Sequence, residues 1–192
     1  RQPRDRQCAR ESVHGGGLFP AARHHAVDYW RAMSKAGTPI EARIITTSSG
    51  AGLFGSVSQA NYSAAKAGIA SFTIVSAAEL DRYGIKINGI APSARSRMTE
   101  DAFAEMMKKP DSGFDAMDPA NVSPVVVWLG SSACEISGRM FETSGGELSV
   151  ADGWQHGQVF NKGARYEAAE VGAVIADLLR EAPATAPVYG AN

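Results

Sequence analysis

A phenol, an ammonium group and a hydroxyl lie near one another in the middle of this sequence. Tyr62 and Lys66 are four residues apart in an alanine-rich segment, and residues four apart on a helix are neighbours on its surface. Ser49 ends the β-branched run at residues 43–49. A cation next to a phenol favours its ionised form, and such a phenol can move a proton to or from a carbonyl oxygen. With Ser49 donating a hydrogen bond to that oxygen, the three residues predict interconversion of an alcohol and a carbonyl.

Each of these residues also has an ordinary structural explanation. A tyrosine and a lysine four residues apart usually lie on a solvated helix face, and a serine that ends a strand usually caps or turns the chain. The order and spacing of Ser49, Tyr62 and Lys66 together favour the functional interpretation.

The hydrophobic pattern predicts alternating strands and helices. Strands are expected at residues 43–49, 85–91 and 139–143. Helices are expected at residues 18–35, 61–83, 119–129 and 167–181, with a short helix opened and capped by Thr99, and residues 50–58 are expected to form a loop. Strands that alternate with helices predict an α/β fold with a parallel sheet and right-handed crossovers.

The segment with Ser49, Tyr62 and Lys66, in which Gln-Ala-Asn precedes the tyrosine, resembles the catalytic segment of the short-chain dehydrogenases/reductases. The resemblance implies a Rossmann-like, doubly wound parallel sheet, NAD or NADP as cofactor, and hydride transfer. It also implies that Ser49 positions the substrate oxygen and Tyr62 is the acid/base. Lys66 would hold the nicotinamide ribose, so Tyr62 and Lys66 would both contact the cofactor.

The same resemblance implies that the fold is N-terminally incomplete, because no glycine-rich turn follows a first strand. The run from Gly50 to Gly55 has the spacing G-x-G-x-x-G, but no second strand ends in an acidic residue further on, so it is interpreted as a loop bordering the substrate. Residues 1–12 are expected to be a disordered leader outside the core. Residues 13–150 would be the C-terminal portion of the dehydrogenase domain, and residues 151–192 an extension with an amphipathic helix.

Further site residues follow only from the family resemblance. The segment after the strand at residues 85–91 matches the part of the family that touches the nicotinamide, which implies contacts from Pro92, Ser93, Ala94 and Ser96. His14 stands where many members carry an asparagine that supports the lysine through a water. The histidines show no metal-ligand spacing, so no metal site is predicted.

The segments at residues 59–66, 91–99, 122–129 and 138–142 resemble the hydroxyacyl-CoA dehydrogenase branch of the family, found in peroxisomal multifunctional enzyme type 2 and in bacterial relatives. The similarity implies oxidoreduction of a 3-hydroxyacyl thioester. A 3-oxoacyl-carrier-protein reductase or a small ketone reductase remains an alternative within the family. A truncated, non-catalytic fragment that dimerises with an intact relative is an alternative outside it. Arg95 and Arg97 would either meet an anionic acyl carrier or pair with nearby acids.

Composition narrows the choice of partners. The 192 residues include 44% hydrophobic and 20% charged residues, as in globular domains, and the net charge of −1 gives no electrostatic case for nucleic acid or an anionic membrane. Two cysteines are too few for a disulfide framework, which favours a reducing cytoplasm. No apolar run reaches the roughly 20 residues of a membrane span. A homodimer or homotetramer is expected for the complete protein, through the helices at residues 18–35 and 61–83.

Overall fold

The computed structural model describes residues 19–151 and 153–190. The expected leader and His14 lie outside these residues. The strands are β1 (Ala42–Thr47), β2 (Ile85–Ser93), β3 (Met140–Ser144) and β4 (Glu147–Ala151). The helices are α2 (Phe19–Lys35), α3 (Gly50–Phe54), α4 (Ala60–Leu80), α5 (Arg97–Ala102), α6 (Ala104–Met107), α7 (Ser123–Leu129) and α8 (Ala168–Glu181). Two 3₁₀ turns, η1 (Asp81–Tyr83) and η2 (Pro119–Val122), follow α4 and precede α7.

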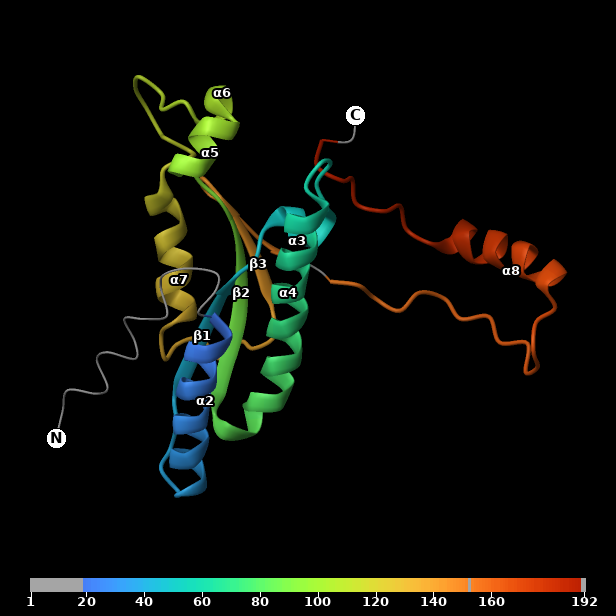
Figure 1. Cartoon of the computed structure of the whole chain (residues 1–192), viewed down its shortest axis with the longest axis horizontal. Coiled ribbons are helices and arrows are strands. Elements are labelled where there is room, and N and C mark those ends of the chain that lie inside the picture. The colour runs from blue at the N-terminus through green and yellow to red at the C-terminus, as the bar shows by residue number, and fades with distance from the viewer. Residues whose placement is uncertain (1–18, 152, 191–192) are drawn as a thin grey trace.

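The four strands form one sheet in the order β1-β2-β3-β4 (Figure 1). The first three strands run parallel, which confirms the predicted α/β architecture. The last strand was not predicted. It pairs antiparallel with β3, and Gly145 and Gly146 form the two-residue turn between them. Two consecutive glycines are a common turn for such a hairpin, because that turn needs a backbone conformation with positive φ.

Helices cover both faces of the sheet, as in a doubly wound fold (Figure 1). One face carries α2 and α4, and its apolar core has the buried residues Val27, Ala42, Leu80 and Ile85. The other face carries α7, and its core has the buried residues Ile90, Leu129, Cys134 and Phe141. Successive side chains of a strand point to opposite faces, and so the apolar runs in β1 and β2 supply both cores.

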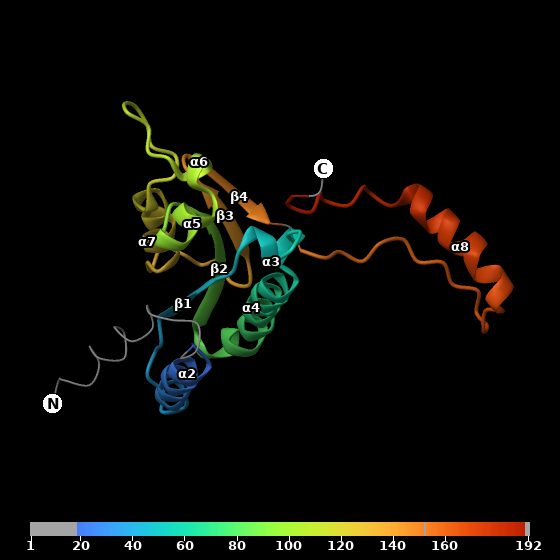
Figure 2. The same cartoon turned by 45° about the horizontal axis from the view of Figure 1, so that its top comes forward.

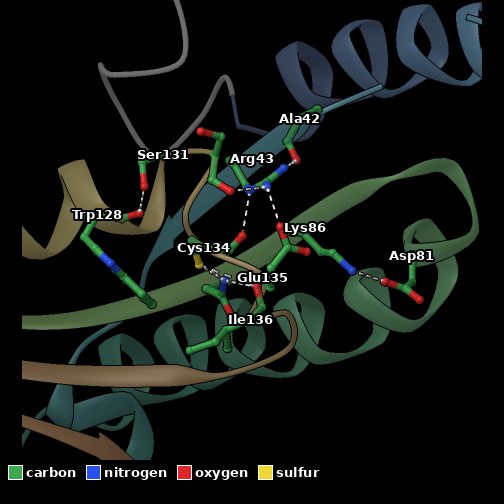
Figure 3. A network of polar contacts seen from close by, with 11 residues as sticks. Ala42, Arg43, Asp81, Lys86, Trp128, Ser131, Cys134, Glu135 and Ile136 are labelled. Carbon is green, nitrogen blue, oxygen red and sulfur yellow. Dashed lines mark hydrogen bonds and ion pairs between the residues drawn. The ribbon is translucent and has the colours of Figure 1, made fainter. Parts of the chain in front are cut away.

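Arg43 ties the amino end of β1 to the loop that leads into β3 (Figure 3). Its Nε donates to the Cys134 carbonyl oxygen over 2.9 Å, and its guanidinium lies 3.7 Å from the Glu135 carboxylate. The side chain of Arg43 is only 9% exposed. A buried guanidinium must be paired, and these contacts meet that need while fixing the amino end of the sheet, opposite the candidate site.

Two local expectations were wrong. The segment after β1 begins with the short helix α3 instead of a loop, and Ser49 is its N-cap. The next short helix starts at Arg97, and Ser96 is the N-cap, while Thr99 occupies the third helical position of a capping box. Serine and threonine both suit a cap, so the sequence alone did not distinguish between the two residues.

A long arm leaves the body of the protein after β4 and returns to it. In both views the chain runs outward, forms α8 far from the sheet, and comes back beside α3 (Figures 1 and 2). The predicted amphipathic helix is present, and its apolar residues Val171, Ile175 and Leu179 are exposed. Among the described residues, no helix has the length and apolar character that crossing a membrane requires.

Candidate active site

Ser49 lies directly beyond the carboxyl end of β1. Its Oγ accepts a hydrogen bond from the backbone N–H of Ala51 over 3.2 Å, because a serine at an N-cap satisfies a free N–H of the first helical turn. The cap occupies the oxygen as an acceptor and leaves the hydroxyl proton available for donation. A helix and a strand end therefore hold this hydroxyl in a defined place, with a proton to offer to a substrate oxygen.

Tyr62 and Lys66 lie on consecutive turns of α4, as their spacing predicted. The Lys66 Nζ lies 5.7 Å from the centroid of the Tyr62 ring and donates to the Thr47 carbonyl oxygen over 3.1 Å. Tyr62 is 41% exposed, so its phenol is accessible to a ligand. An ammonium group has three protons to donate, and the contact with Thr47 uses one of them. Two remain for the phenol or for a ligand hydroxyl.

Ser48 fixes α4 against the end of β1. Its Oγ donates to the backbone carbonyl oxygen of Lys66 over 2.8 Å, and its backbone N–H donates to the Ile90 carbonyl oxygen over 2.8 Å. Ser48 is 2% exposed, whereas the neighbouring Ser49 is only half-buried. Ser48 is therefore buried and bonded within the protein, whereas Ser49 is partly accessible at the candidate site. The sequence did not single out Ser48, because four hydroxyl residues stand in a row there.

Gly52 allows α3 to approach α4 at the same point. A Cβ on this glycine would lie 2.5 Å from the Lys66 Cβ and 2.6 Å from its backbone carbonyl carbon. Any larger side chain would push the two helices apart. Together with Ser48, Gly52 sets the position of Lys66 relative to Ser49. The close packing of α3 against α4 therefore explains a glycine in this run without a phosphate-binding role.

The residues predicted to contact the cofactor lie at the end of β2 and at the start of α5. Pro92 and Ser93 are the last residues of β2, and Ala94 follows them. The carboxyl ends of neighbouring parallel strands meet at one edge of the sheet, so these residues lie at the same edge as Ser49. Ser96 is further along, and its Oγ accepts from the Thr99 N–H over 3.2 Å as a helix cap. The contacts of all four with a nicotinamide stay predictions.

Arg95 forms ion pairs with acidic residues of this chain. Its guanidinium forms an ion pair with Asp115 and lies 3.9 Å from the Glu100 carboxylate. The side chains of Arg95 and Asp115 are 12% and 13% exposed, so this pair is largely buried. For Arg95 the contacts support pairing with nearby acids over contact with an acyl carrier. Arg97 is exposed on α5.

The site residues fall within a match to a known family. Residues 24–107 match the family model described as short chain dehydrogenase. A crystal structure of a short chain dehydrogenase from Mycobacterium avium is 56% identical in sequence, with a TM-score of 0.76, over 89% of this chain and 56% of that one.

Two curated relatives carry hydroxyacyl-CoA or peroxisomal names. Hydroxyacyl-CoA dehydrogenase ChsB1 of Mycobacterium tuberculosis is 39% identical over 142 residues, which are 72% of this chain and 44% of that protein. Peroxisomal multifunctional enzyme type 2 of Mus musculus is 42% identical over 104 residues, or 54% of this chain and 13% of that protein. The chain thus spans about half the length, or less, of these relatives. The family match includes Ser49, Tyr62 and Lys66, and the chain is similar over most of its length to short-chain dehydrogenases/reductases.

Proposed function

We propose that this chain carries the catalytic residues of an NAD(P)-dependent oxidoreductase that interconverts a hydroxyl and a keto group on a 3-hydroxyacyl thioester. The observation that carries the proposal is the joint placement of Ser49, Tyr62 and Lys66. The end of β1 and the first turns of α4 are fastened to each other by the hydrogen bond from Ser48 to the Lys66 carbonyl. The Ser49 hydroxyl at the end of β1 and the Tyr62–Lys66 pair on α4 support a common site for a substrate oxygen.

The chemistry at this place follows from the groups present. In the direction of reduction, the keto oxygen gains negative charge as a hydride reaches its carbon, and the Ser49 hydroxyl donates a hydrogen bond to that oxygen. Tyr62 transfers its phenolic proton to the same oxygen, which completes the alcohol. The positive charge of Lys66 stabilises the phenolate left behind. Oxidation of the alcohol uses the same residues in reverse.

A nicotinamide cofactor fits the residues at this edge of the sheet. When bound, it supplies or accepts the hydride. Lys66 retains two protons for a ribose diol, and the carboxyl end of β2 brings Pro92 and Ser93 to the same edge. Nothing in the described residues distinguishes NAD from NADP, so both belong in the first experiment.

The thioester substrate is supported by the names of the relatives. One is a hydroxyacyl-CoA dehydrogenase and another a peroxisomal multifunctional enzyme type 2, while a 3-oxoacyl-carrier-protein reductase of Synechocystis is 37% identical over 107 residues. The names of the dehydrogenase and of the reductase both indicate keto/hydroxy chemistry next to an acyl group. A substrate panel should therefore contain a 3-oxoacyl-CoA, a 3-oxoacyl carrier protein and a small ketone.

The test begins with binding and continues with turnover. The purified 192-residue chain is titrated with NADH and with NADPH while the nicotinamide fluorescence is followed, and NAD(P)H oxidation is then measured on the substrate panel. We expect saturable binding of one nucleotide and the highest kcat/KM with 3-oxoacyl-CoA. Folded protein that binds neither nucleotide would contradict the proposal and would favour the non-catalytic fragment.

A further inference from the structure

The C-terminal end of the arm forms a strap on the segment between Ser49 and Tyr62; the strap is defined as residues 187–190. Tyr189 forms a β-bridge with Ser56. The Val57 N–H donates to the Tyr189 carbonyl oxygen over 2.9 Å, and the Tyr189 N–H donates to the Gly55 carbonyl oxygen over 3.2 Å. Figures 1 and 2 both show the returning chain beside α3. Two backbone hydrogen bonds thus attach the strap to the loop that follows α3.

The ring of Tyr189 is seated against the residue next to Ser49. A Cβ on Gly50 would lie 2.8 Å from the Tyr189 Oη and 2.9 Å from its Cε2, so the ring occupies the space that a side chain would need. Phe54 contacts the same ring edge to face, with the centroids 6.4 Å apart and the planes at 80°. This geometry is favourable for two aromatic rings.

The phenol of Tyr189 keeps its proton in this place. Burial raises the pKa of Tyr189, and the negative charge of Glu142 raises it further. Glu142 lies on β3 opposite Ala91 of β2, one residue before Pro92. The Tyr189 hydroxyl, which lies beside Gly50 and so next to Ser49 in the chain, can donate a hydrogen bond.

We propose that Tyr189 is a specificity-determining residue, and that the strap forms the wall of the substrate site next to Ser49. The inference rests on the proposed function, because Ser49 marks the place of the keto oxygen. The rings of Tyr189 and Phe54 would contact the acyl chain beside the keto carbon. An apolar wall at this point favours an acyl substrate over a small ketone, which gains little from the contact.

The position of the strap against the loop after α3 can be tested without an activity assay. An ideal Cβ on Gly190 lies 3.7 Å from the Val57 Cβ, within the usual range for a disulfide. Gly190 has a φ of 75°, where a side chain is strained, and the test and control variants both carry this strain because both contain Gly190→Cys. The double variant Val57→Cys/Gly190→Cys is oxidised with oxidised glutathione, and the linked peptides are identified by mass spectrometry, which also separates any linkage through Cys8 or Cys134. We expect rapid formation of the designed disulfide. The control is Ala78→Cys/Gly190→Cys, since Ala78 is exposed near the far end of α4 and should not link.

The role of the ring is tested by steady-state kinetics. Tyr189→Ala should raise KM for 3-oxoacyl-CoA on the order of tenfold, the scale of a lost apolar contact in a substrate site, and should raise KM for a small ketone much less. Tyr189→Phe retains the ring and should restore most of the KM. The dissociation constant of the nicotinamide should stay the same in both variants. Tyr166→Ala is the matched control, because Tyr166 lies in the arm and donates to the Phe160 carbonyl.

The outcomes separate the strap from the proposed function. Failure of the disulfide to form would overturn the strap whatever the activity. A disulfide together with an unchanged KM in Tyr189→Ala would overturn the role of Tyr189 and leave the proposed function intact. A chain without turnover of any substrate would contradict the proposed function, and the specificity role with it, while the disulfide yield would still decide where the strap lies.

Discussion

Tyr62 and Ser49 have different roles in the proposed reaction. The serine is held by a helix cap, which fixes its oxygen and leaves its proton free for donation. The tyrosine is more accessible and lies one turn from the ammonium that supports its anion. In the proposed mechanism the proton transfer depends on Tyr62, whereas Ser49 orients and stabilises the substrate oxygen.

The substitution Tyr62→Phe removes the transferable proton and keeps the ring. We expect kcat to fall by about 10²–10⁴-fold, the usual contribution of a general acid or base, with no change in nicotinamide binding. Stopped-flow measurement of NAD(P)H oxidation and the fluorescence titration together test both parts. Tyr29→Phe serves as the control, because Tyr29 is 52% exposed on α2. Full activity in Tyr62→Phe would show that another group moves the proton.

Glu142 should make the stability of the fold depend on pH. Burial raises the pKa of Glu142 above its ordinary value of 4.5, so the folded state holds this proton to a higher pH than the unfolded state. The free energy of unfolding should therefore fall as pH rises from about 4.5 through the raised pKa. Glu142→Gln, which cannot ionise, should be more stable than the unsubstituted chain at pH 7, and the difference should vanish below pH 4.5.

Urea unfolding at several pH values measures this difference. Glu147→Gln is the control, since Glu147 is exposed on the neighbouring strand. The same pH dependence in Glu142→Gln and in the unsubstituted chain would show that the half-buried Glu142 carboxyl is not the cause.

At the scale of elements, the site is a junction between a strand and two helices. The strand β1 ends at the serines, α3 begins there, and α4 returns over the strand end with Tyr62 and Lys66 in its first two turns. The junction is tight where Gly52 faces Lys66. Interiors are packed densely enough that one added methyl group has consequences at such a contact.

The substitution Gly52→Ala tests the junction. The added Cβ would meet the backbone of α4, which cannot move aside as a flexible side chain does, so we expect a loss of about 1–3 kcal/mol in the free energy of unfolding. Gly68→Ala is the matched control in the same pair of helices. A Cβ there meets nothing within 4 Å, and alanine should be neutral or stabilise the helix by up to about 1 kcal/mol. Equal denaturation midpoints for the two variants would contradict the close approach.

Prediction of elements succeeded where the signal was local and regular. The long α4 and the amphipathic α8 appear with boundaries close to those expected. The segment of α4 is rich in alanine, and the apolar residues of α8 recur at helical spacing. The hairpin of β3 and β4 was missed, although Gly145 and Gly146 mark its turn and apolar residues alternate in β4. The short α3 had no comparable signal, because a five-residue helix rich in glycine depends on its cap and its packing against α4.

The whole molecule consists of a packed body and an arm that contributes little to the core. Leu129 is 1% exposed in the body, whereas Leu179 on α8 is 67% exposed. The outer edge of β1 pairs with no other strand among the described residues. An unpaired edge and an exposed apolar helix face both favour self-association. The expected oligomer through the helices at residues 18–35 and 61–83 remains a proposal.

Paired leucine substitutions measure how stability is distributed. Leu129→Ala creates a cavity in the core between the sheet and α7, and we expect it to cost about 2–5 kcal/mol in the free energy of unfolding. Leu179→Ala should change that free energy by less than about 0.5 kcal/mol. Urea denaturation at a low protein concentration compares the two. A large loss from Leu179→Ala would show that α8 is covered in solution, and its dependence on protein concentration would indicate a second copy as the cover.

The sequence by itself determined the local chemistry of this protein. Helical spacing places Tyr62 beside Lys66, and a β-branched run delivers a serine at a strand end. These relations hold within a few residues of chain, where backbone geometry fixes which side chains are neighbours. The tertiary structure alone decided that Ser48 fastens the strand end to Lys66, that Gly52 admits α4, and that Tyr189 returns to cover Gly50. Such contacts join residues far apart in the chain, and they depend on how the elements pack, which no local pattern encodes.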